Sequence, residues 1–246
     1  MPPIAAAQGE VTVGSVSLHF RRWGDPAASP VLLLHGGASN SSTWQRLGSA
    51  LAARGLQAIA PDLRGHGRSS RSTSYGLGDH ANDVSGFLDA LSLPNVAMVG
   101  HSLGAYVAAL VTQREPRRVT RLVLEEPPVP NPASDGSPSS GLTRGRILLL
   151  AAGSMLRRRR YDPRAVVSAI AQLRLPDPGW WDSLASIAVP TLVLAGGPGS
   201  HIDPDLLARM SQALPHARLE IIPVGHRIHS KAPDAFIPLV SSFLVP

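Results

Sequence analysis

Short, almost wholly apolar runs recur along this chain, and patterns typical of helices lie between most of them. The runs are PVLLLHGG from Pro30, LQAIAPD from Leu56, VAMVGHS from Val96, RLVLEE from Arg121, TLVLAGG from Thr191 and ARLEIIPVGH from Ala217. Such runs suit parallel strands that are buried on both faces. The helix-like segments are 42–53, 79–91, 103–115, 204–214 and 233–244. This alternation predicts an α/β fold with a doubly wound, mostly parallel sheet built from right-handed crossovers.

The N-terminal region and the helix ends carry further signals. Residues 11–20 alternate in polarity around a Gly-Ser turn, which predicts an antiparallel hairpin. Asp79 is expected to be the N-cap of its helix, because its carboxylate can accept backbone N–H bonds. Pro204 and Pro233 suit first-turn positions, where the missing proline N–H costs nothing.

One interval departs from the alternation of predicted strands and helices. Residues 127–189 separate two core strands by more chain than a single crossover needs. The interval begins with a Pro/Ser/Gly-rich loop and continues with helical patterns at 147–156 and 162–173. We therefore predict a core formed by 1–126 and 190–246, with 127–189 inserted as a helical lid.

Composition narrows the classes of protein to which the chain can belong. Of its 246 residues 43% are hydrophobic and 16% charged, which is typical of a globular protein. The net charge is +6, and the one dense basic run, Arg157–Arg160, is read as a solvated helix face in preference to an anion-steering patch. No zinc-finger spacing or second basic stripe indicates nucleic acid. The absence of cysteine excludes disulfides and thiolate metal sites.

Targeting and membrane signals are weak in this sequence. The N-terminal MPPIAAAQGE has no basic segment leading into an apolar one, which argues against a secretory signal. The longest apolar run, 147–156, is about half of the roughly 20 residues that a bilayer requires. The sequence predicts a soluble, cytoplasmic protein with no membrane partner.

A candidate nucleophile lies between an apolar run and a helical pattern. Gly100-His101-Ser102-Leu103-Gly104 has the form G-x-S-x-G, follows NVAMV and opens the segment LGAYVAALVTQ. This order of strand, sharp turn and helix is the context in which a serine is presented as a nucleophile. The alternative is that Ser102 only caps the helix.

Two further segments and a late histidine extend the pattern. They are His35-Gly36-Gly37, the run 60–69 (APDLRGHGRS) and Gly225-His226. Taken in order with the Ser102 turn, they make the chain resemble the α/β-hydrolase fold family from about Val11 to Leu244. The resemblance implies that the backbone N–H groups of Gly37 and Leu103 form an oxyanion hole. It implies neither a metal ion nor an organic cofactor.

The general base is expected at the same sheet edge as the nucleophile. His226 follows the last apolar run, and the resemblance assigns the base to the histidine of this late Gly-His pair. His229 is the alternative, although we expect it to pack at the start of the last helix.

The acid that orients the base is displaced. In most α/β-hydrolases an aspartate stands four residues before a proline after strand 7, but that position holds Ser200 here. Asp203 could substitute, yet its place before Pro204 is typical of a helix N-cap. Some dehalogenases and lactone-cleaving members carry the acid at the end of strand 6, and this pattern puts it on Glu126. Because strand residues alternate between faces, only one of Glu125 and Glu126 is expected to reach His226.

These features predict a serine hydrolase that cleaves a small-molecule carboxylic ester or lactone through an acyl-enzyme, with Ser102, His226 and Glu126 as the catalytic residues. A cofactor-free perhydrolase or haloperoxidase-like enzyme, a lyase, and a catalytically silent binding protein remain alternatives. Met155 and Trp181 in the predicted lid are candidate substrate contacts, although the Trp180-Trp181 pair could instead anchor the lid. The oligomeric state stays open.

Overall fold

A central sheet organises the protein in the computed structural model, which describes residues 4–130, 132 and 160–245. Within these residues eight strands follow the order β1-β2-β4-β3-β5-β6-β7-β8. Their bounds are β1 Ala7–Val13, β2 Val16–Trp23, β3 Pro30–Leu34, β4 Gln57–Pro61, β5 Val96–His101, β6 Val119–Glu125, β7 Thr191–Ala195 and β8 Ala217–Ile221. The pairs β1–β2 and β2–β4 are antiparallel, and the other neighbours are parallel. The predicted hairpin and the mostly parallel sheet are both confirmed.

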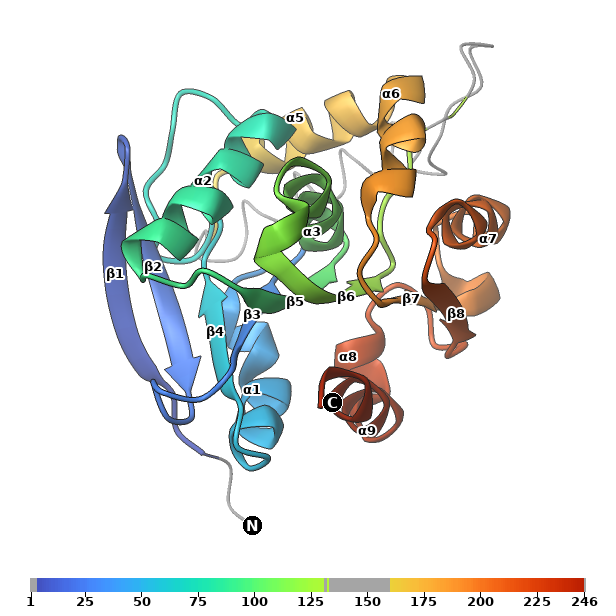
Figure 1. The fold of residues 1–246 in the computed structure, drawn as a ribbon. Coiled ribbons are helices and arrows are strands. Elements are labelled where there is room, and N and C mark those ends of the chain that lie inside the picture. Colours follow the sequence, from blue (N-terminus) through green and yellow to red (C-terminus); the bar gives the residue numbers. More distant parts are fainter. Residues whose placement is uncertain (1–3, 131, 133–159, 246) are drawn as a thin grey trace.

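Helices cover both faces of this sheet (Figure 1). Helices α1 and α9 lie together on one face, and α2 and α3 lie together on the other. The α-helices are α1 Gln45–Ala52, α2 Leu77–Ala90, α3 Leu103–Arg114, α5 Pro163–Leu173, α6 Pro178–Asp182, α7 Pro204–Ala213, α8 Ile228–Lys231 and α9 Pro233–Leu244. Short 3₁₀ helices are η1 Ser41–Trp44, η2 Pro116–Arg118, η3 Ser183–Ser186 and η4 Gly197–Gly199. The doubly wound α/β architecture is therefore as predicted.

Helix ends follow the expected signals with one correction. Pro204 and Pro233 occupy the first turns of α7 and α9, as predicted. The prediction for Asp79 is wrong, because α2 begins at Leu77 and its N-cap is Gly76. Asp79 lies inside the first turn, where its carboxylate accepts the Gly76 N–H at 3.0 Å. The carboxylate therefore still caps the helix, but from the third helical position.

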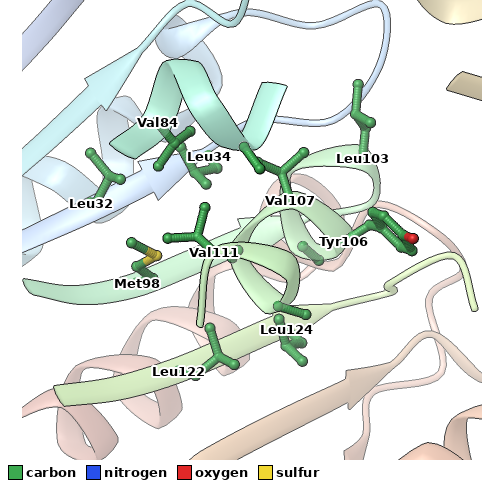
Figure 2. Packing of buried hydrophobic residues seen from close by; sticks show 14 of the residues in the cluster. Leu32, Leu34, Val84, Met98, Leu103, Tyr106, Val107, Val111, Leu122 and Leu124 are labelled. Atoms are coloured by element: carbon green, nitrogen blue, oxygen red, sulfur yellow. The ribbon is translucent and has the colours of Figure 1, made fainter. Parts of the chain in front are cut away.

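The two faces of the sheet carry two separate hydrophobic clusters. Leu32 and Leu34 belong to the cluster that also contains side chains of α3, whereas Leu33 belongs to the cluster on the opposite face. Figure 2 shows strand residues such as Met98 close to Val111 of α3. Because successive strand residues alternate between faces, a strand covered on both sides must be apolar throughout. Each fully buried leucine contributes roughly 1.5–3 kcal/mol of transfer free energy.

The predicted insertion contributes α5, α6 and η3 to the described structure. The Trp180 ring stacks on Tyr106 of α3 with centroids 5.6 Å apart, and the Trp181 indole N–H donates to the Pro130 carbonyl at 2.9 Å. The Asp162 N–H donates to the Gly65 carbonyl at 2.6 Å. These contacts attach both helices to the sheet-bearing part of the chain. The division into core and lid stays a prediction.

Some sequence predictions fall outside the described residues. They are the helix at 147–156, the substrate contact Met155, and Arg157, Arg158 and Arg159 of the basic run. Among the described helices, none is long and apolar enough to cross a membrane.

Candidate active site

Ser102 occupies a strained turn between β5 and α3. Its backbone has φ 51° and ψ −120°, a conformation that costs a non-glycine residue about 1–3 kcal/mol. Its N–H donates to the Glu125 carbonyl at 2.9 Å, which ties the turn to β6. The Ser102 side chain makes no cap hydrogen bond to α3, so the role of a simple helix cap finds no support in the described contacts. The strain is instead typical of a side chain held for function.

Close backbone packing explains the two glycines that flank this turn. A Cβ on Gly104 would lie 2.2 Å from the Leu34 carbonyl oxygen, and one on Gly100 would lie 2.5 Å from the Ala105 Cα. Because backbone atoms cannot move aside cheaply, both positions require glycine. The turn can therefore form only with the spacing seen in the sequence.

The loop after β3 brings the predicted oxyanion-hole residues to the same place. Gly37 from this loop and Leu103 from the start of α3 both line the cavity that also contains Ser102. The Ala38 N–H in this loop donates to His66 Nε2 at 3.3 Å. Burial lowers the pKa of His66 to about 3, so its imidazole is neutral and can accept this bond. The loop is thus held by a buried histidine.

The predicted base and acid lie in contact. The His226 ring Nδ1 donates to Glu126 Oε2 at 3.1 Å. The His101 ring Nε2 is 2.8 Å from the His226 carbonyl oxygen, and the His201 ring lies 4.0 Å from the His226 ring between centroids. Among the described contacts, Ser102 Oγ and His226 share the cavity without a direct hydrogen bond. Catalytic hydrogen bonds in ligand-free sites often tighten only when substrate binds.

Glu126 sits in a pocket of hydrogen-bond donors just beyond the end of β6. Its side chain is fully buried, and it accepts from the Gly196 N–H and from the Ser200 hydroxyl as well as from His226. Burial alone would raise the pKa of the Glu126 carboxyl, but these hydrogen bonds outweigh burial and hold the pKa below its usual value. Glu126 is therefore a carboxylate that faces the imidazole.

Ser200 thus belongs to the same site, but as a hydrogen-bond donor to the acid and not as the acid itself. Its hydroxyl donates to the carboxylate that comes from the neighbouring strand end, and its Oγ also accepts the Ile202 N–H at 3.0 Å. Asp203 accepts the Asp205 N–H at 2.9 Å as the N-cap of α7. Asp203 is not among the residues that line the cavity. The sequence interpretation of Asp203 as a helix cap is confirmed.

His229, the alternative base, contacts the other glutamate. Its Nδ1 lies 2.9 and 2.8 Å from the two Glu125 carboxylate oxygens, and its Nε2 lies 2.7 Å from Thr43 Oγ1. Donor atoms of His101, Glu125 and His229 all lie within 4.8 Å of one another, a set that could ligate a metal ion. These atoms are already engaged, because His229 Nδ1 binds Glu125 and His101 Nε2 binds the His226 carbonyl.

The family of this architecture can now be named. The family described as alpha/beta hydrolase fold matches residues 29–140, which include the loop of Gly37, the Ser102 turn and Glu126. The chain has the α/β-hydrolase fold. Its sheet order and covering helices agree with that fold.

Several relatives place this α/β-hydrolase among proteins of different activities. Uncharacterized proteins of Mycobacterium tuberculosis and Mycobacterium bovis are 41% identical over 95 residues, and the match spans 38% of this chain and 28% of theirs. The sn-1-specific diacylglycerol lipase ABHD11 of Mus musculus is 26% identical over 90% of this chain and 82% of its own length. The solved structure of Est816, described as an N-acyl homoserine lactone degrading enzyme, is 25% identical with a TM-score of 0.79 over 96% of this chain and all of that one.

The cavity of this α/β-hydrolase has a volume of about 330 Å³. This lies near the lower end of the roughly 300–1,000 Å³ typical of ligand pockets. Much of its wall is apolar and comes from four residues of α5: Val166, Ala169, Ile170 and Leu173. Polar residues also line the cavity, Ser102 and His226 among them. The arrangement suits a small, mainly apolar molecule with one reactive polar group.

Sequence reasoning missed most of the cavity wall. The α5 residues 166, 169, 170 and 173 follow the spacing of one helical face, a pattern that could have identified the wall. Arg227 also lines the cavity and has no such signal. Trp181 is not among the lining residues, because its indole is turned toward the Pro130 carbonyl and its ring lies under Arg209 at 5.1 Å. The anchoring alternative describes this tryptophan better than the substrate contact.

Proposed function

We propose that this protein is a serine hydrolase that cleaves a small carboxylic ester or lactone through an acyl-enzyme. The observation that carries the proposal is the buried Glu126 carboxylate bonded to the His226 ring in the cavity where the strained Ser102 turn opens. An acid fixes the tautomer of the base and stabilises the imidazolium that forms during reaction. The other imidazole nitrogen is then the one that takes the serine proton.

The proposed reaction has two halves. Ser102 Oγ attacks the carbonyl carbon while His226 takes its proton, and the N–H groups of Gly37 and Leu103 stabilise the oxyanion. The protonated His226 gives its proton to the leaving alcohol, and the acyl group stays on Ser102. Water then attacks the acyl-enzyme with His226 as base, which releases the acid and restores the serine. In a lactone the leaving alcohol remains attached to the acyl group.

The substrate class follows from the cavity and agrees with the relatives. Apolar side chains of α5 line the same cavity as Ser102 and His226, which suits an acyl chain or a lactone ring with an apolar substituent. Lactone degradation is described for the structural relative Est816, and lipase activity for the mouse relative.

Covalent labelling tests the proposal directly. A fluorophosphonate probe is expected to form a stable adduct on Ser102, located by peptide mapping, because an activated serine attacks phosphorus as it attacks a carbonyl. Ser102→Ala is the control that should take no label. A wild-type protein that stays unlabelled would favour the silent binding protein. Product analysis with ester, lactone and peroxide substrates then separates hydrolysis from perhydrolysis.

Ser200→Ala should weaken catalysis without abolishing it. The variant removes one hydrogen bond to the Glu126 carboxylate, and hydrogen bonds to charged groups contribute about 1.5–3 kcal/mol. We therefore expect kcat on a turned-over ester to fall roughly tenfold to a hundredfold. Ser230→Ala, on an exposed serine of α8, is the matched control and should keep the wild-type kcat. Equal rates for both variants would contradict a role of Ser200 in holding the acid.

A further inference from the structure

A second pair of a glutamate and a histidine lies beside the proposed catalytic pair. Glu125 is fully buried at the end of β6, and its carboxylate accepts the His229 backbone N–H at 2.9 Å and the His229 ring Nδ1–H at 2.8 Å. Burial alone would raise the pKa of the Glu125 carboxyl, but the neighbouring His101 and His229 hold it below its usual value. Because the carboxylate only accepts, the Nδ1 of His229 carries a proton. Its Nε2 is left to bond Thr43 Oγ1 at 2.7 Å.

This row of three side chains joins the parts of the site that must keep a fixed spacing. Thr43 lies in η1, which directly follows the loop that carries Gly37. Glu125 also accepts the Ser102 N–H through its main-chain carbonyl. One hydrogen-bonded connection therefore runs from the segment after the Gly37 loop, through His229, to the strand end next to the Ser102 turn.

His101 extends the connection to the loop of the base. Its ring lies 4.8 Å from the ring of His229 and 4.8 Å from the ring of His226, measured between centroids. Burial lowers the pKa of His101 to about 3, so the ring is neutral and carries one proton. That proton fits on Nε2, which donates to the His226 carbonyl at 2.8 Å. The second pair thus packs against the residue that holds the base loop.

Thr43, His229 and Glu125 have the residue types of a catalytic triad, but the surroundings of Thr43 argue for a different role. Thr43 is not among the residues that line the cavity, whereas Ser102 is. Thr43 lies within a regular 3₁₀ turn and is absent from the described non-glycine residues with positive φ. A substrate carbonyl in the cavity would meet Ser102 and not Thr43.

We propose that Thr43, His229 and Glu125 form a positioning row that keeps the oxyanion-hole loop in register with the Ser102 turn. The inference rests on the proposed function, since it assigns these residues to the same reaction. The row acts through the placement of Gly37, and none of its members needs to exchange a proton with substrate. Loss of placement by about 1 Å at such a site can cost on the order of 100-fold in rate.

The test removes one hydroxyl and keeps the shape of the side chain. Thr43→Val deletes the partner of His229 Nε2, and we expect the rate of Ser102 phosphonylation and kcat on an ester to fall roughly tenfold or more. KM should stay within about twofold, because the cavity wall is unchanged. Thr43→Ser restores the hydroxyl and should recover most of the rate. Ser42→Val, on an exposed neighbour in the same turn, is the matched control and should behave as wild type.

The outcomes separate this inference from the function on which it rests. Suppose that the wild-type protein takes the label and that Thr43→Val and Ser42→Val are labelled at equal rates. This result would contradict the positioning row and leave the hydrolase proposal unaffected. A fall in the thermal midpoint of Thr43→Val with no change in kcat would do the same, because it marks a purely structural bond. An adduct mapped to Thr43 would overturn both assignments. If the wild-type protein takes no label, the result contradicts the proposed function and also the positioning row that rests on it.

Discussion

Glu126→Gln is expected to lower kcat about 10⁴-fold on any ester that the protein turns over. The amide keeps the volume of the side chain but loses the charge that stabilises the imidazolium, and its N–H₂ group can face the His226 ring in place of an acceptor. Disturbing the acid in a serine triad in this way has an effect of about 10⁴ on kcat. KM and the far-ultraviolet circular dichroism spectrum should change little, which distinguishes lost chemistry from lost fold.

Asp203→Asn is the matched control for this variant, because Asp203 is the other acid near the position where the family usually places one. Asp203 is exposed and accepts the Asp205 N–H as the cap of α7. Asparagine is about as good a cap as aspartate, so the free energy of unfolding should fall by about 1 kcal/mol at most and kcat should be retained. An inactive Asp203→Asn beside an active Glu126→Gln would reverse the assignment of the acid.

The fold was predictable because its signals are local. The apolar runs predict buried strands, and proline and glycine mark the helix ends and tight turns. The turn at Gly100 to Gly104 could be predicted from its spacing together with the strand before it and the helix after it, and backbone contacts with Leu34 and Ala105 require both glycines. The prediction for Asp79 failed by three residues, since a carboxylate can cap a helix from the N-cap or from inside the first turn.

The candidate site was predictable in its residues but less so in its geometry. Strand alternation predicts that Glu125 and Glu126 reach different partners, and the structure places them against His229 and His226. The actual cause is partly different, because β6 ends at Glu125 and Glu126 adopts φ 52°, outside regular strand geometry. The pattern of polar and apolar residues does not predict a backbone conformation of this kind.

Some contacts between distant segments could not be predicted from the sequence. The bond between Thr43 and His229 joins residues 186 positions apart, and neither residue has a local pattern that marks it. Trp181 is a different case. Its sequence context is consistent with two roles, because an aromatic residue in a predicted lid can bind substrate or anchor the lid. The contact of its ring with Arg209 of α7, outside the predicted lid, favours anchoring.

Loss of stability in mild acid is the second large effect that we expect. Burial lowers the pKa of His66, His80 and His101 to about 3 from the ordinary 6.5, so the folded protein keeps these rings neutral. Below pH 6.5 the unfolded chain binds protons that the folded chain does not, and stability therefore falls as the pH falls from 6.5 toward 3. Each such histidine removes on the order of 1 kcal/mol per pH unit in this window.

The three histidines together would remove about 3 kcal/mol per pH unit, against a typical total stability of about 5–15 kcal/mol. The depressed carboxyl groups, Glu125 and Glu126 among them, add their loss only below about pH 4.5, so they do not account for a fall that begins near pH 6.5. Thermal unfolding followed by circular dichroism at pH 7.5 to 4.5 measures the effect. A thermal midpoint that stays constant to pH 4.5 would contradict it.

His80→Leu isolates the contribution of one histidine to this acid sensitivity. The His80 ring is fully buried, and both of its nitrogens lack a hydrogen-bond partner in the part of the chain that the structure describes. Leucine fills a similar space without a titratable group, so the variant should lose about 1 kcal/mol per pH unit of the pH dependence and match or exceed wild-type stability at pH 5. His216→Leu, on an exposed histidine, should keep the wild-type slope. Equal slopes for both variants would mean that His80 takes up its proton in the folded state as readily as in the unfolded chain.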